Sequence, residues 1–133
     1  MTLDHTIRQA YINTLLDGGF TRLADKTTNP TEGYIVGGVV EPTTMKLDAV
    51  ATSITYRDAM QYEEFKELWH KYEMELDEMP FTSGMGVGTW IHEGQIYFDL
   101  VQRIYNLDVA TRVAKERGEI AIYDCKNQKE ILL

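Results

Sequence analysis

The sequence predicts an α+β fold with a mostly antiparallel sheet of five or six strands, one long acidic helix and two shorter helices. Short segments rich in β-branched and aromatic residues alternate with turn residues along much of the chain, as in strands joined by hairpins. Residues 58–78 instead carry their apolar side chains at helical spacing. A length of 133 residues suits one core, so we expect a single domain, residues 1–133, with a candidate hinge at residues 80–88 between its two halves.

The N-terminal half is predicted to contain a helix followed by strands. Asp4 can cap this helix, and Gly18-Gly19 can end it. Three strands are then expected, at residues 20–24, 34–40 and 47–54. We expect the first two to pair as a hairpin, because the segment between them is rich in Thr, Asn, Pro and Gly.

The long helix is the most charged element of the chain. Asp58 and Gln61 have the spacing of a capping box, and Pro80 closes the segment. Eight acids and two lysines give residues 58–78 a net charge of −6, in a chain whose net charge is −8. The apolar side chains that fall within an arc of about 100° are Phe65, Leu68, Trp69, Tyr72 and Leu76. These side chains are predicted to face the core, which leaves an acidic face toward solvent.

The C-terminal half is predicted to be a hairpin, a helix and a final strand. The glycine-rich residues 80–88 are expected to form a loop. Residues 89–92 and 95–99 are then expected to pair through a tight turn at Glu93-Gly94. The elements expected after this hairpin are a helix at residues 109–117 capped by Asn106 or Asp108, a strand at residues 120–123, a polar turn at residues 126–129 and an apolar tail at residues 131–133.

Composition argues against several classes of protein. Cys125 is the only cysteine, so no internal disulfide can form and a cytoplasmic location is expected. We expect no membrane association, because no segment approaches about 18 apolar residues and the N-terminus does not resemble a signal peptide. Direct binding of nucleic acid is not expected either, because it requires clustered Lys and Arg side chains.

No residue is predicted to be catalytic, to bind a cofactor or to bind a metal. His92-Glu93 with Asp99 lacks the H-E-x-x-H spacing and lies in a predicted hairpin rather than on a helix. Residues 84–88 are interpreted as a hinge, because they lead into a predicted strand whereas a phosphate-binding loop leads into a helix. Lys126 could lower the pKa of the Cys125 thiol, but no positioned base accompanies it.

The order of several short motifs is recognisable. They are Leu15–Gly19 and Gly33–Gly37 in the first half, and Gly88-Thr89-Trp90, Gly94–Asp99, Asp108, Ala110 and Arg117–Asp124 in the second. This order resembles that of small, mostly uncharacterised proteins encoded by phages and integrative elements of Gram-positive hosts, especially actinobacteria. The resemblance implies an accessory gene of a mobile element, of a kind that often inhibits host defence, as anti-CRISPR proteins do. It implies no catalytic residue, and the long acidic helix departs from the family's usual members.

The sequence therefore favours a non-enzymatic acidic interaction protein. We expect it to inhibit a host nucleic-acid-binding or defence enzyme by occluding a basic surface of that host protein. The residues expected to bind this partner are Glu63, Glu64, Glu67, Glu73, Glu75, Glu78, Tyr62 and Met74, of which Tyr62 and Met74 are expected to be exposed. Two alternatives stay open: a module that self-assembles as a homodimer through its apolar tail, and a small enzyme of unknown type that uses His92, Asp99 or Cys125.

Overall fold

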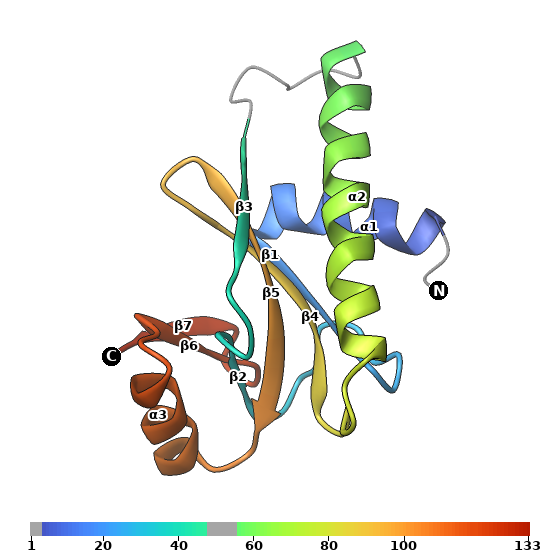
Figure 1. Cartoon of the computed structure of the whole chain (residues 1–133). Helices are drawn as coiled ribbons and strands as arrows, with labels where there is room; N and C mark the ends of the chain where they lie inside the picture. The colour runs from blue at the N-terminus through green and yellow to red at the C-terminus, as the bar shows by residue number, and fades with distance from the viewer. Residues whose placement is uncertain (1–3, 48–55) are drawn as a thin grey trace.

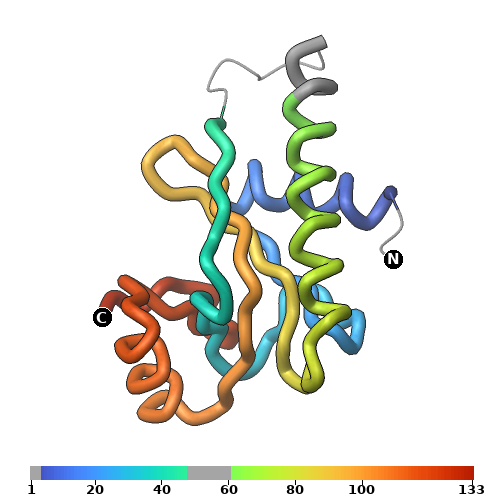
Figure 2. Tube along the Cα trace, viewed as in Figure 1, coloured from blue at the N-terminus to red at the C-terminus, as the bar shows by residue number. Residues whose placement is uncertain are grey.

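The computed structural model describes residues 4–47 and 56–133, including their side chains except those of residues 56–60. Within these residues it contains three helices and an antiparallel sheet of seven strands, so the predicted α+β class is confirmed (Figures 1 and 2). The elements are α1 (Asp4–Asp17), β1 (Gly19–Leu23), β2 (Tyr34–Val36), β3 (Thr43–Lys46), α2 (Tyr56–Asp77), β4 (Met85–His92), β5 (Gln95–Ile104), α3 (Leu107–Glu116), β6 (Ala121–Asp124) and β7 (Lys129–Leu132).

The number of strands differs from the expected five or six. The predicted polar turn is present at residues 126–128, and the predicted apolar tail belongs largely to a strand, β7, which pairs with β6. β3 lies between the second and third predicted strands, where no strand was expected. The strand expected at residues 47–54 lies almost entirely outside the described residues.

The sheet is organised around β5, the longest strand. The strand order is β1-β4-β5-β2-β6-β7, and β3 also pairs with β5. β4 runs along one side of β5, whereas β3 and β2 share the other side. β3 pairs with residues 95–98 and β2 with residues 102–104, so residues 99–101 face a gap on that side. The chain between β2 and β3, residues 37–42, passes this gap.

The predicted hairpin between the first two strands was wrong. β1 pairs with β4, and β2 pairs with β5 and β6. The cause lies in two glycines of β4. A Cβ atom on Gly86 would overlap the carbonyl oxygen of Arg22 in β1, and one on Gly88 would lie 2.7 Å from a methyl carbon of Val101. The missing side chains let the neighbouring chains approach closely, so residues 85–88 form a strand instead of the expected loop.

Locally encoded features were predicted more accurately. β4 and β5 form the expected hairpin, and both turn residues, Glu93 and Gly94, have positive φ angles of 50° and 74°. α3 is capped by Asn106, whose side-chain oxygen accepts a hydrogen bond from the Val109 amide. These elements depend on a few adjacent residues, which is why their sequences specify them.

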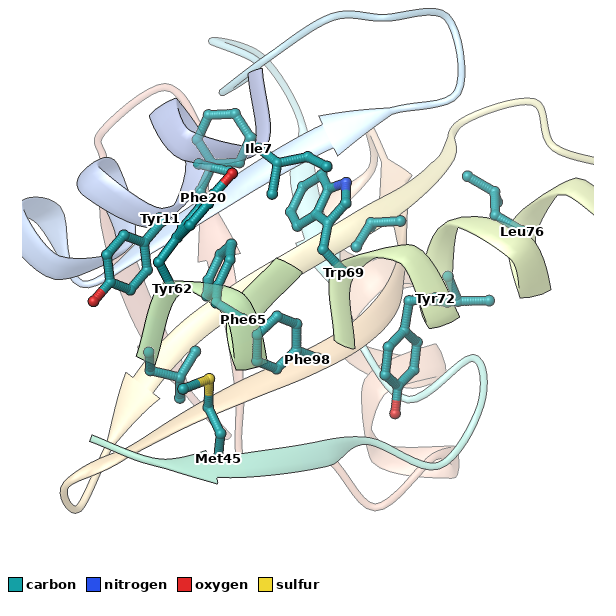
Figure 3. Close-up of a cluster of buried hydrophobic side chains, with 14 residues drawn as sticks. Ile7, Tyr11, Phe20, Met45, Tyr62, Phe65, Trp69, Tyr72, Leu76 and Phe98 are labelled. Carbon is teal, nitrogen blue, oxygen red and sulfur yellow. The ribbon is translucent and has the colours of Figure 1, made fainter. Parts of the chain in front are cut away.

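α1 and α2 cover the main core. α2 crosses α1, and together they pack on β1, β3, β4 and β5 (Figures 1 and 3). Figure 3 shows Phe65, Trp69 and Tyr72 projecting from successive turns of α2, with Phe98 of β5 between Phe65 and Tyr72. A second, smaller cluster lies between α3 and the strands β2 and β6. The orientation of α2 is therefore set by a row of buried rings.

Candidate functional site

The outer face of α2 carries three exposed glutamates, Glu63, Glu64 and Glu67, and exposed Glu78 directly follows the end of the helix. Glu75 is half-buried, and Met74 is 62% exposed, as expected. The buried face of the same helix carries the rings that pack on the sheet. Helical periodicity thus separates the acidic and apolar sides of this element.

These outward carboxylates have no ion pair with a described Lys or Arg side chain. The two lysines of α2 are directed elsewhere: Lys66 lies 2.9 Å from Asp4 of α1, and Lys71 donates a hydrogen bond to Thr43 of β3 at 3.0 Å. Neither lysine of α2 therefore forms an ion pair with these carboxylates, although Lys71 lines the same hollow as Glu75 and Glu78.

Two of the predicted partner-binding residues are engaged within the fold. Tyr62, expected to be exposed, is 2% exposed because it packs beneath α1, where its hydroxyl donates to Asp4 at 2.8 Å and Arg8 lies 4.1 Å from the ring centre. Burial raises the pKa of Tyr62 to about 12. Glu73 is half-buried and accepts a hydrogen bond from the indole of Trp69 at 3.1 Å. The exposure expected for Tyr62 was therefore wrong, and the acidic surface consists of Glu63, Glu64, Glu67, Glu75 and Glu78.

A second site, which the sequence did not predict, lies in the gap beside β5. Asp99 is 5% exposed, and its Oδ2 accepts a hydrogen bond from the Gly38 amide at 2.6 Å. Its other oxygen, Oδ1, is buried and has no hydrogen-bond partner among the described residues. A buried carboxyl oxygen without a donor is costly when the group is ionised, so this group has a reason to hold a proton.

Glu119, from the turn between α3 and β6, faces the same gap. A Cβ atom built on Gly37 would lie 2.5 Å from Oδ2 of Asp99 and 2.5 Å from Oε1 of Glu119. The two carboxyl groups therefore both lie within reach of one methyl group, and only glycine fits between them. Arg117 adjoins them and donates to the carbonyl of Gly37 at 3.2 Å and to the side-chain oxygen of Gln102 at 2.7 Å.

The protonation of this pair follows from its surroundings. Burial, more than any other cause, raises the pKa of Asp99 to about 7. The hydrogen bond from the Gly38 amide favours the ionised form and opposes this shift, whereas the charge of Glu119 adds to it. Burial also raises the pKa of Glu119, whereas Arg117 opposes the shift of both groups. The signal in the sequence was an acid between apolar residues, Phe98 and Leu100. Its closeness to His92 was the one relation of Asp99 that the sequence indicated.

The candidate catalytic residues do not come together. His92 lies at the end of the β4–β5 hairpin, where its Nε2 is 3.6 Å from Glu93, and Asp99 faces Gly38 instead. Cys125 is buried, and burial raises the pKa of its thiol to about 11. The expectation that Lys126 lowers the pKa of the Cys125 thiol was therefore wrong.

In the described part of the chain, no cluster of three or more His, Cys, Asp and Glu side chains could hold a metal ion.

Two surface hollows of about 460 and 420 Å³ lie away from these groups. The first lies between α2 and residues 40–41, and the second between residues 31–34 and the β6–β7 turn. Neither is lined by His92, Asp99 or Cys125. Neither of these two hollows therefore supplies a substrate cavity at the three residues on which an enzyme hypothesis depended.

No protein-family model matches the chain, and no curated protein or solved structure matches it either. The function therefore has to be argued from the surfaces and buried groups described above. Among the described residues, no helix is both long and apolar enough to cross a bilayer.

Proposed function

We propose that this protein is a non-enzymatic binding protein whose acidic α2 surface captures a protein partner with a basic surface. The observation that carries the proposal is the set of outward carboxylates on α2 without an ion pair to a described Lys or Arg. A rigid helix presents these charges, because its opposite face is fixed by buried rings. Such a surface accelerates encounter with a cationic partner and disfavours anionic ones.

The class of partner follows from the shape and charge of this surface. Glu63, Glu64 and Glu67 occupy the N-terminal part of the described helix, and Glu75 and Glu78 lie near its C-terminal end. A row of carboxylates along a 22-residue helix matches an extended basic surface better than a single cationic side chain. A groove that binds nucleic acid is such a surface. If this protein occupied the groove, the phosphate backbone of the nucleic acid could not bind there.

The proposed origin in a phage or other mobile element rests on the motif resemblance alone. Within that proposal, the partner is a nucleic-acid-binding or defence enzyme of a Gram-positive host, and the protein acts as an anti-CRISPR-like or related inhibitor. Occlusion needs no catalytic residue, which is compatible with the buried Cys125 and with the half-buried position of His92 at the end of a hairpin.

Reversal of charge on α2 is expected to weaken partner capture strongly while preserving the fold. The variant is Glu63→Lys, Glu64→Lys and Glu67→Lys together, since all three side chains are exposed. The protein is immobilised, exposed to host lysate, and its partner is identified by mass spectrometry and purified. We expect the triple variant to bind that purified partner with an association rate constant reduced by roughly tenfold or more at low salt. Circular dichroism should be unchanged.

The matched control reverses three exposed glutamates elsewhere, Glu32, Glu116 and Glu130, and so changes the net charge equally. If both variants lose binding alike, only net charge matters and the α2 surface is not the contact. If neither loses binding, the proposal is wrong.

Self-assembly is the second candidate, favoured by apolar side chains around the β6–β7 hairpin. Leu132 is 77% exposed, and Ile120, Tyr123 and Leu133 are also exposed. β7 ends the path of paired strands among the described residues, and such an edge can pair with another chain. Sedimentation velocity at several concentrations, with Leu132→Lys as the variant, distinguishes the candidates. A concentration-dependent dimer that Leu132→Lys dissociates supports self-assembly, and a monomer at all concentrations excludes it.

A further inference from the structure

A hollow of about 460 Å³ lies between the C-terminal end of α2 and residues 40–41 of the connection between β2 and β3. Three apolar residues, Val40, Met79 and Pro80, contribute to its lining. Val40 and Met79 are half-buried, because they also pack against the main core. The hollow therefore contains an apolar surface that the core holds in place.

The two walls of this hollow are joined by Tyr72, a buried residue of α2. Its side chain extends from the helix toward β3 (Figure 3). The Tyr72 hydroxyl donates to the carbonyl of Glu41 at 2.9 Å and lies 2.7 Å from the hydroxyl of Thr43. A group that enters the hollow therefore meets a surface that is already formed, and little ordering of the protein is needed on binding.

Three carboxylates line the same hollow, those of Glu41, Glu75 and Glu78. Within the described part of the chain, none of these side chains forms an ion pair or a hydrogen bond. Glu75 is half-buried, so its charge is partly removed from water without a counter-charge. Lys71 also lines the hollow, but its Nζ donates to Thr43 at 3.0 Å instead. One cation thus accompanies three carboxylates, which leaves the lining with a net charge of −2.

An arginine side chain has the chemistry that this lining matches. Its stem of methylene groups is apolar and can cover Val40 and Met79, whereas its guanidinium group carries a positive charge and several N–H donors for the carboxylates. A planar guanidinium bonds two carboxylates at once and is less strongly hydrated than an ammonium group, so arginine fits better than lysine. A neutral apolar side chain would leave the carboxylates unpaired, and an anion would be repelled.

We propose that this hollow is the docking point for an arginine side chain of a basic protein partner. The proposal rests on the partner-binding function proposed for α2, and it names the group that this end of α2 recognises. Glu63, Glu64 and Glu67 attract the partner over a distance, and the hollow holds one of its arginines in contact. Phe81, which is 82% exposed and follows Pro80 in the chain, adds an aromatic side chain of the kind enriched at protein interfaces.

The test uses a small probe, so it does not require the partner. N-acetyl-arginine amide is titrated into the full chain, and backbone amide shifts are followed by NMR at about 0.15 M salt. N-acetyl-citrulline amide is the control, because it has nearly the same shape and no charge. We expect saturable shifts with the arginine probe at millimolar concentration, largest at residues 40–41 and 75–80, and binding of the citrulline probe that is weaker by about tenfold or more.

Two double variants locate the binding site. Glu75→Gln with Glu78→Gln removes two of the three carboxylates of the hollow and should weaken binding of the arginine probe by about fivefold or more. The matched control is Glu63→Gln with Glu64→Gln, which makes the same change of charge on the same helix at residues that do not line the hollow. This control should weaken binding by less than about twofold. Circular dichroism should be the same for both variants.

Absence of saturable shifts, or equal binding of the two probes, would overturn the docking point. Equal losses in the two double variants would also overturn it, because general attraction to a negative chain would then explain the binding. Failure of the partner-binding function looks different. In that case the triple reversal at Glu63, Glu64 and Glu67 binds the purified partner as the wild type does, whatever the probes show.

Discussion

Replacement of Asp99 by Asn is expected to stabilise the protein at pH 8 and to have little effect near pH 4. Burial raises the pKa of Asp99 from 3.8 to about 7, so between these values the folded state binds a proton that the unfolded chain has released. The free energy of unfolding therefore decreases as the pH rises from about 4 to 7, and the stabilising effect of the proton is lost above the folded pKa. Each pKa unit corresponds to about 1.4 kcal/mol, so the wild type should lose on the order of 2 to 4 kcal/mol across this range.

Urea denaturation at several pH values between 4 and 8 measures this effect. In Asp99→Asn the slope should be much smaller, and the residual slope should come from Glu119, whose pKa burial also raises. The lowered pKa values of Asp4, Asp25 and Asp124 act in the opposite direction and only in acid, because those carboxylates lose their stabilising bonds as the pH falls through their folded pKa. Glu130→Gln should retain the wild-type profile. If Asp99→Asn is destabilised equally at every pH, Asp99 is ionised in the folded protein and this interpretation fails.

The parts of the fold that the sequence predicted are those specified by neighbouring residues. The Glu93-Gly94 turn and the Asn106 cap each depend on contacts within four residues. The pairing of β1 with β4 joins residues 19–23 to residues 86–90, and no local signal identifies this partner. The segment between β1 and β2 is rich in turn residues, so a hairpin of these two strands was expected. The glycines at positions 84, 86 and 88 were a usable signal, because alternating glycines place one face of a strand against a close neighbour.

Only the part of the candidate site that lies on α2 could be predicted, because helical spacing determines which side chains share a face. A helical stripe of rings specified which carboxylates of α2 face outward, and it placed Tyr62 only at the edge of the stripe. Tyr62 is buried because α1 crosses above it, and this is a tertiary contact that the stripe does not contain. The Asp99–Glu119 pair likewise depends on the gap between β2 and β3, which exists only in the folded sheet. Neither feature could be inferred from spacing along the chain.

Truncation of Trp69 is expected to be the most destabilising single change in α2. Its side chain is 0% exposed, stacks with Phe65 at a centroid distance of 6.2 Å and lies 5.9 Å from Phe20 of β1 (Figure 3). Trp69→Ala removes these contacts, leaves a cavity between helix and sheet, and frees a half-buried Glu73 from its hydrogen bond. We expect the free energy of unfolding to fall by about 3 to 5 kcal/mol, measured by urea denaturation. That is a large part of the roughly 5 to 15 kcal/mol typical of a domain.

Met74→Ala is the matched control, because it shortens an exposed side chain of the same helix and should change stability by less than about 0.5 kcal/mol. Trp69→Phe separates the two contributions of the indole. It retains a ring in the core but loses the donor to Glu73, and should cost about 1 to 2 kcal/mol. If Trp69→Ala costs no more than Met74→Ala, the row of rings does not fix α2 on the sheet. The carboxylates on its outer face would then not be held in fixed positions relative to the sheet. They would not form one surface that a basic partner could bind.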